Sequence, residues 1–383
     1  MEKKTRVLFW YWGRKGGGAR YAAEIGKEFW EQKELDVYYS LSRQGHFFEE
    51  LSHVPYDRCC HIDTYQGWFS AVVASFRLFG VARKLRRFVE KKKIEVVYCP
   101  MTHIWNPLLL NLILPKGTRF VLTVHDALLH PGEDNVLRSA LIDREIKRAD
   151  AFIVLSDHVR ASLESRRIVA DKEITVVPHS VFDYVEGNDQ LRARELPRDR
   201  EVRLLFFGRF LPYKGISLLL KACRAVVEQG WNMKLELSGS GDLTDCQEEI
   251  DTYPGKIRIE NRWIEEDEIF ETFDRADIVV VPYVEASQSG VIPISIGMGI
   301  PCVVTPVGGL IEQVADGRLG LISEQLNPEA FAEAVTRLLR APQLYSDLSK
   351  ACLGAARDLS WSSAARKIAA ELMRSTTEAP RSE

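Results

Sequence analysis

Two cations beside a glycine are the residues whose types and spacing point most directly to chemistry. Arg209 and Lys214 follow an apolar run that starts at Val202 and ends at Gly208, and from Gly215 an apolar stretch with helical spacing begins. A buried parallel strand would place this loop at its carboxyl end, where open α/β sheets bind ligands. Arginine offers a planar fork of donors and lysine a mobile point charge, so the pair suits a diphosphate. The plain alternative is two solvated cations on a loop.

A second loop, SQSG, lies between the apolar run 278–283 and another apolar helical segment. We expect its backbone N–H groups to face an anion, with the helix dipole adding attraction. The residues concerned are Gln288, Ser289, Gly290 and Val291. A third turn at Gly308 and Gly309 follows the next apolar run. Ordinary tight turns would explain each loop separately, but we expect all three to converge on one edge of one sheet.

The first half of the chain has a glycine loop of its own. The apolar run 6–12 is followed by GRKGGGAR and then by a predicted helix over residues 21–32. Gly17 and Gly18 would leave backbone N–H groups open to an anion at a helix N-terminus. The G-x-G-x-x-G spacing of dinucleotide-binding loops is absent, and a plain tight turn is the alternative.

A His-Asp pair ends another apolar run, RFVLTV, in the first half. Most lone histidines are structural, but His125 and Asp126 lie at a carboxyl strand end, where an active-site cleft would open. We expect His125 to line that cleft and Asp126 to fix its tautomer. His130 follows on the next loop, without an assigned role.

Residues 68–93 combine apolar residues at helical spacing with a dense run of cations. A basic helix that contains Trp68 and several phenylalanines can lie on an anionic membrane surface. The cations expected to face the membrane or an acceptor are Arg83, Lys84, Arg86 and Arg87. The alternative is a crossover helix whose cations are merely solvated.

Composition limits the possible classes of protein. The chain has 383 residues, and its net charge of −3 gives no bulk attraction to nucleic acid, although basic residues outnumber acidic ones within 1–200. Seven scattered cysteines without a C-x-x-C pair indicate buried free thiols in a reducing compartment. Neither a signal peptide nor a membrane-spanning apolar stretch is visible. We therefore predict a cytoplasmic protein, peripheral on the inner membrane face.

Strand and helix patterns alternate along both halves, which predicts two Rossmann-like domains facing across a cleft. The motif Arg-Ala-Asp precedes a buried run at both 148–156 and 275–283, a weak internal echo. We place the first domain at 1–183, a polar linker at 184–200, the second domain at 201–357 and a disordered tail at 375–383.

With these residues in hand, the sequence resembles the GT-B-fold retaining glycosyltransferases of family 4. FGRFLPYKG is similar to the donor-phosphate loop of that family, which would make Arg209 and Lys214 the diphosphate clamp, with Gly208 beside them. TVHD is similar to the strand end whose histidine contacts the transferred sugar, and the segment 358–374 to the helix that crosses back onto the N-terminal domain.

One departure from the family concerns two glutamates eight residues apart. Alignment on GIP (299–301) puts Ala286 and Ile294 at their positions, so SQSGVIP resembles a branch that lacks the pair. Glu312 is the substitute candidate for the carboxylate that holds the nucleotide ribose.

The resemblance implies a retaining, metal-independent hexosyltransferase without a cofactor, which uses a UDP- or GDP-sugar. The basic stretch suggests a lipid-linked glycan acceptor for cell-surface polysaccharide synthesis. A soluble-acceptor transferase or epimerase of the same fold stays open, as does a non-catalytic nucleotide-sugar-binding partner protein.

Overall fold

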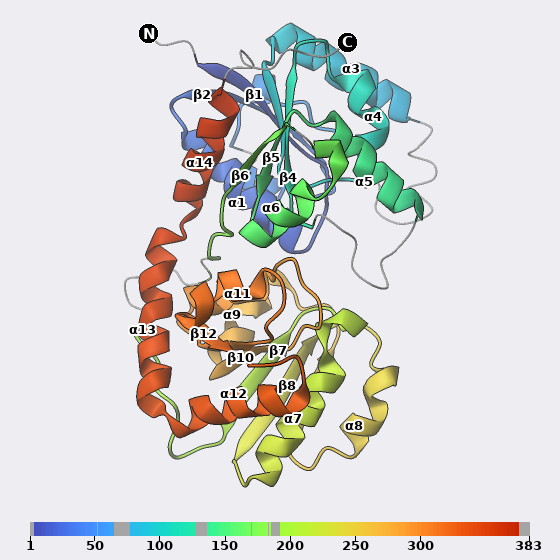
Figure 1. The fold of residues 1–383 in the computed structure, drawn as a ribbon. Helices are drawn as coiled ribbons and strands as arrows, with labels where there is room; N and C mark the ends of the chain where they lie inside the picture. The colour runs from blue at the N-terminus through green and yellow to red at the C-terminus, as the bar shows by residue number, and fades with distance from the viewer. Residues whose placement is uncertain are drawn as a thin grey trace.

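The computed structural model describes residues 4–51, 53–64, 77–126, 136–169, 171–182, 184 and 192–374. Two six-stranded parallel sheets form two lobes, one above the other in Figure 1. The first sheet has the order β2-β1-β3-β4-β5-β6. Its strands are β1 (Thr5–Tyr11), β2 (Leu35–Leu41), β3 (Val96–Cys99), β4 (Arg119–Val124), β5 (Ala151–Val154) and β6 (Glu173–Val176). The predicted pair of Rossmann-like domains is thus confirmed.

Helices cover both faces of the first sheet, as its apolar strands require. They are α1 (Gly17–Glu31), α3 (Leu78–Lys92), α4 (Asn106–Ile113), α5 (Val136–Arg148) and α6 (Asp157–Glu164). The first helix begins four residues before its predicted start because Gly16, at φ 89°, turns the chain directly into it. A serine directly after an apolar run predicts a helix N-cap, and Ser156 does cap α6, accepting the N–H of Val159 at 3.1 Å.

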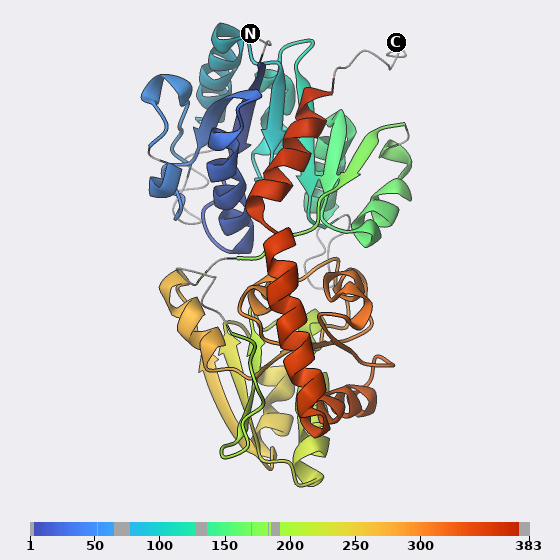
Figure 2. The same ribbon diagram turned by 90° about the vertical axis from the view of Figure 1, so that its left-hand side faces the viewer.

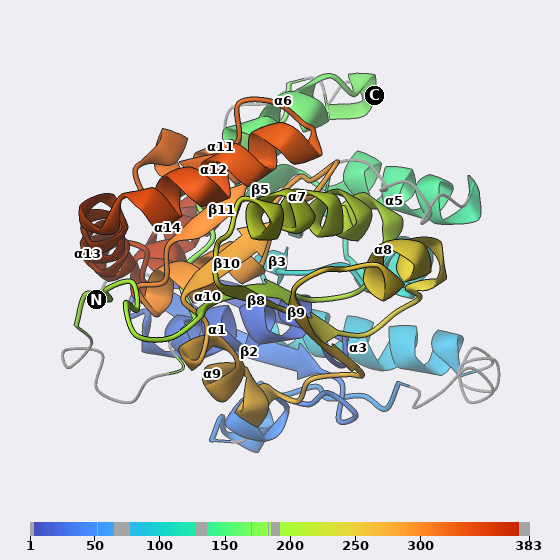
Figure 3. The ribbon, with the colours of Figure 1, turned by 90° about the horizontal axis from the view of Figure 1, so that it is seen from below.

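The second sheet has the order β12-β11-β10-β7-β8-β9. Its strands are β7 (Val202–Phe207), β8 (Met233–Gly239), β9 (Lys256–Asn261), β10 (Ile278–Val281), β11 (Cys302–Val304) and β12 (Gly320–Ile322). Its helices are α7 (Ile216–Glu228), α8 (Gln247–Asp251), α9 (Glu266–Asp274), α10 (Val291–Gly297), α11 (Leu310–Gln313) and α12 (Pro328–Arg340). Figure 3 shows α7 and α12 on one face of this sheet and α9 on the other.

The sequence pattern predicts helices over 216–229, 243–252 and 265–275. The first and third match α7 and α9 within one residue, but the second is broken. A 3-10 turn over Thr244–Cys246 precedes the short α8. Asp242 accepts both the backbone N–H and the hydroxyl of Thr244, at 2.8 and 2.6 Å. This local side-chain bond competes with the first turn of a longer helix.

Two terminal helices, α13 (Pro342–Asp358) and α14 (Trp361–Met373), tie the lobes together, as the red helices of Figure 2 show. The first packs on α10 and the second returns to α1. A buried ion pair between Arg119 and Glu371 anchors the returning helix to the first sheet, where Thr175 also donates to Glu371 at 2.9 Å. The predicted crossing helix is confirmed.

All seven cysteines are free, and only Cys59 is not fully buried, as the composition predicted. No helix in the described part of the chain is long and apolar enough to cross a membrane. Several predictions concern residues that lie outside the described ones: Trp68 and its neighbours to residue 76, His130, linker residues 185–191 and the tail 375–383.

Candidate active-site cleft

The cleft lies where the carboxyl ends of both sheets face each other. His125 follows β4 of the first lobe, and Gln288 follows β10 of the second. Their side chains meet across the cleft, with Gln288 Nε2 3.1 Å from His125 Nδ1. The residues predicted from two distant stretches of sequence therefore share one location.

The cation loop after β7 is held against the strand end of β10. A Cβ at Gly215, whose φ is +69°, would lie 1.9 Å from the Pro282 carbonyl oxygen, so only glycine fits. Lys214 Nζ lies 3.6 Å from the centroid of the Tyr283 ring, a cation–π contact. Arg209 is exposed at the start of the same loop.

Side chains already form hydrogen bonds with some backbone groups of the loop SQSG. Gln313 Oε1 accepts the N–H of Ser289 at 2.7 Å, and its Nε2 donates back to the Ser289 carbonyl at 2.9 Å. The Ser289 hydroxyl accepts the N–H of Val291 at 3.2 Å and contacts the Tyr283 hydroxyl at 3.1 Å. The N–H groups of Gln288 and Gly290 have no partner within the described ranges. The set of donors expected from the sequence thus narrows to these two, and Gln313 is a structural support that the sequence did not indicate.

The third turn completes the convergence of loops. A Cβ at Gly308 would lie 1.8 Å from the carbonyl oxygen of Ala286, and one at Gly309 would lie 2.1 Å from that of Ser287. Lys214 contacts the ring of Tyr283, whose hydroxyl contacts Ser289 of the SQSG loop. The three loops therefore pack directly on one another at the carboxyl edge of the second sheet.

His125 is buried, and its neighbours settle its tautomer. Its Nε2 lies 2.9 Å from the carbonyl oxygen of Pro100. Because a carbonyl only accepts, Nε2 carries the hydrogen, and Nδ1 is the acceptor that receives the Gln288 amide. Burial lowers the pKa of His125, while the Pro100 bond and the charge of Asp126 oppose this shift. The Pro100 carbonyl thus fixes the hydrogen on Nε2, and the role predicted for Asp126 stays a prediction.

Aromatic rings enclose the histidine on the first-lobe side. The ring of Tyr21 meets His125 edge-on at 4.8 Å and also contacts His179 at 5.6 Å and Trp361 at 5.5 Å. Burial lowers the pKa of His179 to about 4, so this second imidazole is neutral. His179 was not among the predicted site residues, although its place just beyond β6 was a usable signal.

The N-terminal glycine loop faces the second lobe. Lys15 Nζ lies 4.7 Å from the Trp263 ring centroid, and Arg20 Nε lies 3.7 Å from a carboxylate oxygen of Glu266. Gly17 and Gly18 form the first turn of α1. Their predicted contact with an anion stays a prediction.

Glu312 bonds to the first lobe through its carboxylate. Its two oxygens accept the N–H groups of Asp157 and His158, each at 2.7 Å, at the start of α6. A cavity of about 660 Å³ between the lobes lies beside this contact and is lined by Glu312, His179 and Pro293 among others. Neither His125 nor the cation loop lines that cavity.

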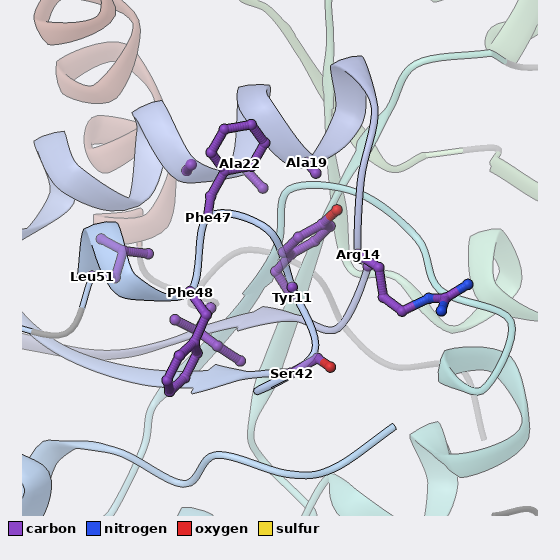
Figure 4. A pocket seen from close by; sticks show the side chains of 12 residues that line it. Tyr11, Arg14, Ala19, Ala22, Ser42, Phe47, Phe48 and Leu51 are labelled. Atoms are coloured by element: carbon purple, nitrogen blue, oxygen red, sulfur yellow. The ribbon is translucent and has the colours of Figure 1, made fainter. Parts of the chain in front are cut away.

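A much smaller cavity, of about 20 Å³, lies beside the glycine loop and has room for about one water molecule. Figure 4 shows Phe47, Phe48 and Leu51 at its walls, with the guanidinium of Arg14 directed away. It is too small for a sugar. No group of three potential metal ligands occurs within the described ranges, and metal independence stays a prediction.

Two family models match adjacent parts of the chain. The model of "Glycosyltransferase Family 4" matches residues 15–182, and that of "Glycosyl transferases group 1" matches residues 201–341. Together with the two-lobed fold, these matches place the chain among the group 1 and family 4 glycosyltransferases of the GT-B fold.

Particular relatives are more distant. A D-inositol 3-phosphate glycosyltransferase of Catenulispora acidiphila is 30% identical over 64% of this chain and 61% of its own length. An uncharacterised glycosyltransferase of Methanocaldococcus jannaschii is 32% identical over 37% of each chain. The chain thus matches less than two thirds of the length of these relatives.

Solved structures share the fold at low identity. Sucrose-phosphate synthase of Thermosynechococcus elongatus superposes with a TM-score of 0.70 at 17% identity, over 96% of this chain and 98% of that one. The Anabaena protein HepE, solved in complex with UDP and glucose, gives a TM-score of 0.71 at 15% identity, over 96% and 99% of the two chains.

Proposed function

We propose that this protein is a retaining glycosyltransferase that moves a sugar from a nucleoside-diphosphate donor to a glycan acceptor. The supporting observation is the packing of three second-lobe loops against one another, opposite His125 of the first lobe. Arg209 and Lys214 stand on one of these loops, where a diphosphate would meet positive charge.

Departure of the diphosphate from the anomeric carbon places negative charge on its oxygens. Fixed donors aimed at such a charge lower the barrier by roughly 3–4 kcal/mol for one donor. Arg209 and Lys214 supply this stabilisation, with the N–H groups of Gln288 and Gly290 beside them. The acceptor hydroxyl bonds to the anomeric carbon on the face that the diphosphate leaves, and its proton passes to the departing phosphate oxygen.

Neutral His125 contributes a hydrogen-bond acceptor at Nδ1. The Gln288 side-chain amide donates to that atom. When a donor binds, a sugar hydroxyl takes the place of the amide, and His125 orients the sugar. Asp126 adds negative charge nearby, which favours the oxocarbenium-like state.

The acceptor is proposed to be lipid-linked, at the inner face of an anionic membrane. The described part of the basic stretch forms α3, and Arg83, Lys84 and Arg87 are exposed along it. Flotation with anionic vesicles tests this point: an Arg86→Glu, Arg87→Glu variant should lose binding, and undiminished binding would remove the membrane from the proposal.

Donor turnover tests the central proposal. Incubation with UDP- and GDP-sugars, without an acceptor, should release free sugar slowly with its anomeric configuration retained. Tight nucleotide-sugar binding without any turnover would instead favour a non-catalytic binding protein. The alternative of a non-catalytic binding protein is supported by one observation: Ala286 and Ile294 stand where many family members have the paired glutamates.

A further inference from the structure

The short segment 100–102, which follows β3, connects His125 to a buried acid on α5. At the first residue of the segment, the Pro100 carbonyl accepts the Nε2 hydrogen of His125 at 2.9 Å. At the last residue, the Thr102 hydroxyl donates to the carboxylate of Glu145. Because only three residues of backbone join the two contacts, the position of Thr102 bears directly on the carbonyl that sets the histidine tautomer.

The middle of the segment is packed as well. The side chain of Met101 lies against the first turn of α1, where a Cβ added to Gly18 would come within 3.0 Å of Met101 Cε. The Met101 carbonyl accepts the thiol hydrogen of Cys99 at 3.2 Å, and Asn106 Nδ2 donates to the Cys99 sulfur at 3.3 Å. The geometry of the segment therefore affects the glycine loop as well as the histidine.

Glu145 has fewer partners than a buried carboxylate requires. It is 2% exposed, and its Oε1 is buried without a hydrogen-bond partner within the described ranges. The Oδ1 atom of the neighbouring Asn106 is buried and unpartnered in the same way. A proton on Glu145 supplies the donor that these two acceptor atoms lack. The ionised acid is instead a buried negative charge, which is costly without a cation beside it.

The charged groups around Glu145 do not neutralise it. Those described on or beside α5 are exposed, in ion pairs or bonded to backbone carbonyls: Arg144, Lys147, Arg148 with Asp150, Arg166 with Asp143, and Lys172. Helix α4 carries no charged residue, and His103 beside Thr102 is neutral because burial and the charge of Arg14 lower its pKa to about 4. Cys99 faces Glu145 from β3, and burial and the carboxylate raise the pKa of its thiol well above the usual value. Burial raises the pKa of Glu145 to about 7, so this acid changes charge near neutral pH.

We propose that Glu145 is a positioning residue for His125, which holds segment 100–102 through Thr102 and thereby the Pro100 carbonyl that fixes the histidine tautomer. Ionisation of Glu145 loosens this connection, so the reaction is fastest while the acid carries its proton. The inference rests on the proposed function and adds to it a residue that acts through other residues rather than on the substrate.

The pH profile of donor hydrolysis by the full chain tests the proposal. In wild type, kcat should fall about fivefold as the pH rises through the pKa of Glu145, the factor expected for loss of one hydrogen bond. Glu145→Gln is a neutral isostere of the protonated acid, so its kcat should match that of wild type at low pH and show no such fall. Thr102→Val should lower kcat about fivefold on the acid side, with KM unchanged, because the donor-binding loops of the second lobe are untouched.

Glu371→Gln is the matched control, because Glu371 is also a buried acid, at 1% exposed, but bonds to Arg119 far from segment 100–102. This variant should lose stability and still keep the wild-type pH profile. The same change of profile in Glu371→Gln and Glu145→Gln would overturn the proposal, because general destabilisation of the first lobe would then explain both.

Nitrogen-15 NMR of histidine-labelled protein follows His125 without any donor. With its signal assigned by loss in His125→Asn, wild type should show the Nε2–H tautomer at low pH and a change of signal as the pH rises through about 7. In Glu145→Gln the signal should stay constant over the same range. Identical His125 signals in the two proteins at every pH would overturn the proposal. Absence of donor hydrolysis in wild type would remove the proposed function instead, and the NMR comparison would still decide the role of Glu145.

Discussion

The two lobes contribute different kinds of chemical group to the cleft. In the second lobe the site is made of backbone: glycines at 215, 308 and 309 let three loops approach within van der Waals contact of neighbouring carbonyl oxygens. In the first lobe it is made of side chains: Tyr21, His125, His179 and Trp361 interlock. A backbone site depends on short segments that are each local in sequence, whereas a side-chain site depends on partners from distant segments. We therefore expect the first lobe to be the more sensitive to changes far from the cleft.

The largest effect should follow from loss of the anchor beneath the first lobe. Glu371→Ala would remove the closer of two carboxylates from the buried guanidinium of Arg119, the other being that of Glu173 at 3.9 Å, and the free energy of unfolding should fall by about 3–5 kcal/mol. Urea unfolding measures this. The matched control is Glu333→Ala, which removes an exposed ion pair with Arg340 and should cost about 0–1 kcal/mol. Equal losses in the two variants would contradict the dependence of the first lobe on its returning helix.

A smaller effect concerns a buried acid behind the first-lobe site. Glu145 is 2% exposed, and burial raises its pKa to about 7, although hydrogen bonds from Thr102 and Asn106 oppose the shift. Because the folded pKa is raised, the stability that this group contributes is complete below its ordinary pKa of about 4.5 and is lost as the pH rises through about 7.

Glu145→Gln removes that titration. At pH 8 the variant should be more stable than wild type by roughly 2–3 kcal/mol, and at pH 4.5 the difference should nearly vanish. Chemical unfolding at the two pH values compares them. A stability difference that does not change with pH would show that Glu145 is ionised in the folded protein throughout.

The smallest effect concerns the hydrogen bond between Gln288 of the second lobe and His125 of the first lobe. Gln288→Ala removes the amide that meets His125 Nδ1, a neutral hydrogen bond with a net contribution of about 1 kcal/mol. We expect the free energy of unfolding to fall by about 1 kcal/mol. Donor turnover should stay close to that of wild type, because the sugar displaces this amide from Nδ1 and alanine keeps the backbone N–H. Gln343→Ala, an exposed glutamine on α13, is the control and should match wild type. A loss of a hundredfold would mean that Gln288 itself acts on the substrate.

The same contrast explains what could be predicted from the sequence. The second-lobe loops were predictable because each is a short stretch of sequence between an apolar run and a helical pattern, marked by a glycine such as Gly215 or Gly308. The fold was predictable for a similar reason, since buried parallel strands appear in the sequence as apolar runs. The crossing helix was expected only from the resemblance of segment 358–374 to the family. Pro100 and Gln313 were not predictable, because each acts through a partner far away in sequence. Position alone could have indicated His179, which lies just beyond β6.

Binding of a nucleoside diphosphate tests the account most directly, because it isolates the leaving group from sugar and acceptor. Calorimetry with UDP and GDP should show one of them binding to wild type, with affinity roughly tenfold to hundredfold lower in Arg209→Met and in Lys214→Met, as loss of a charge-assisted hydrogen bond implies. Arg340→Met, on the far end of α12, should bind as wild type does. Equal affinity in all four proteins would contradict the assignment of these two cations to the diphosphate.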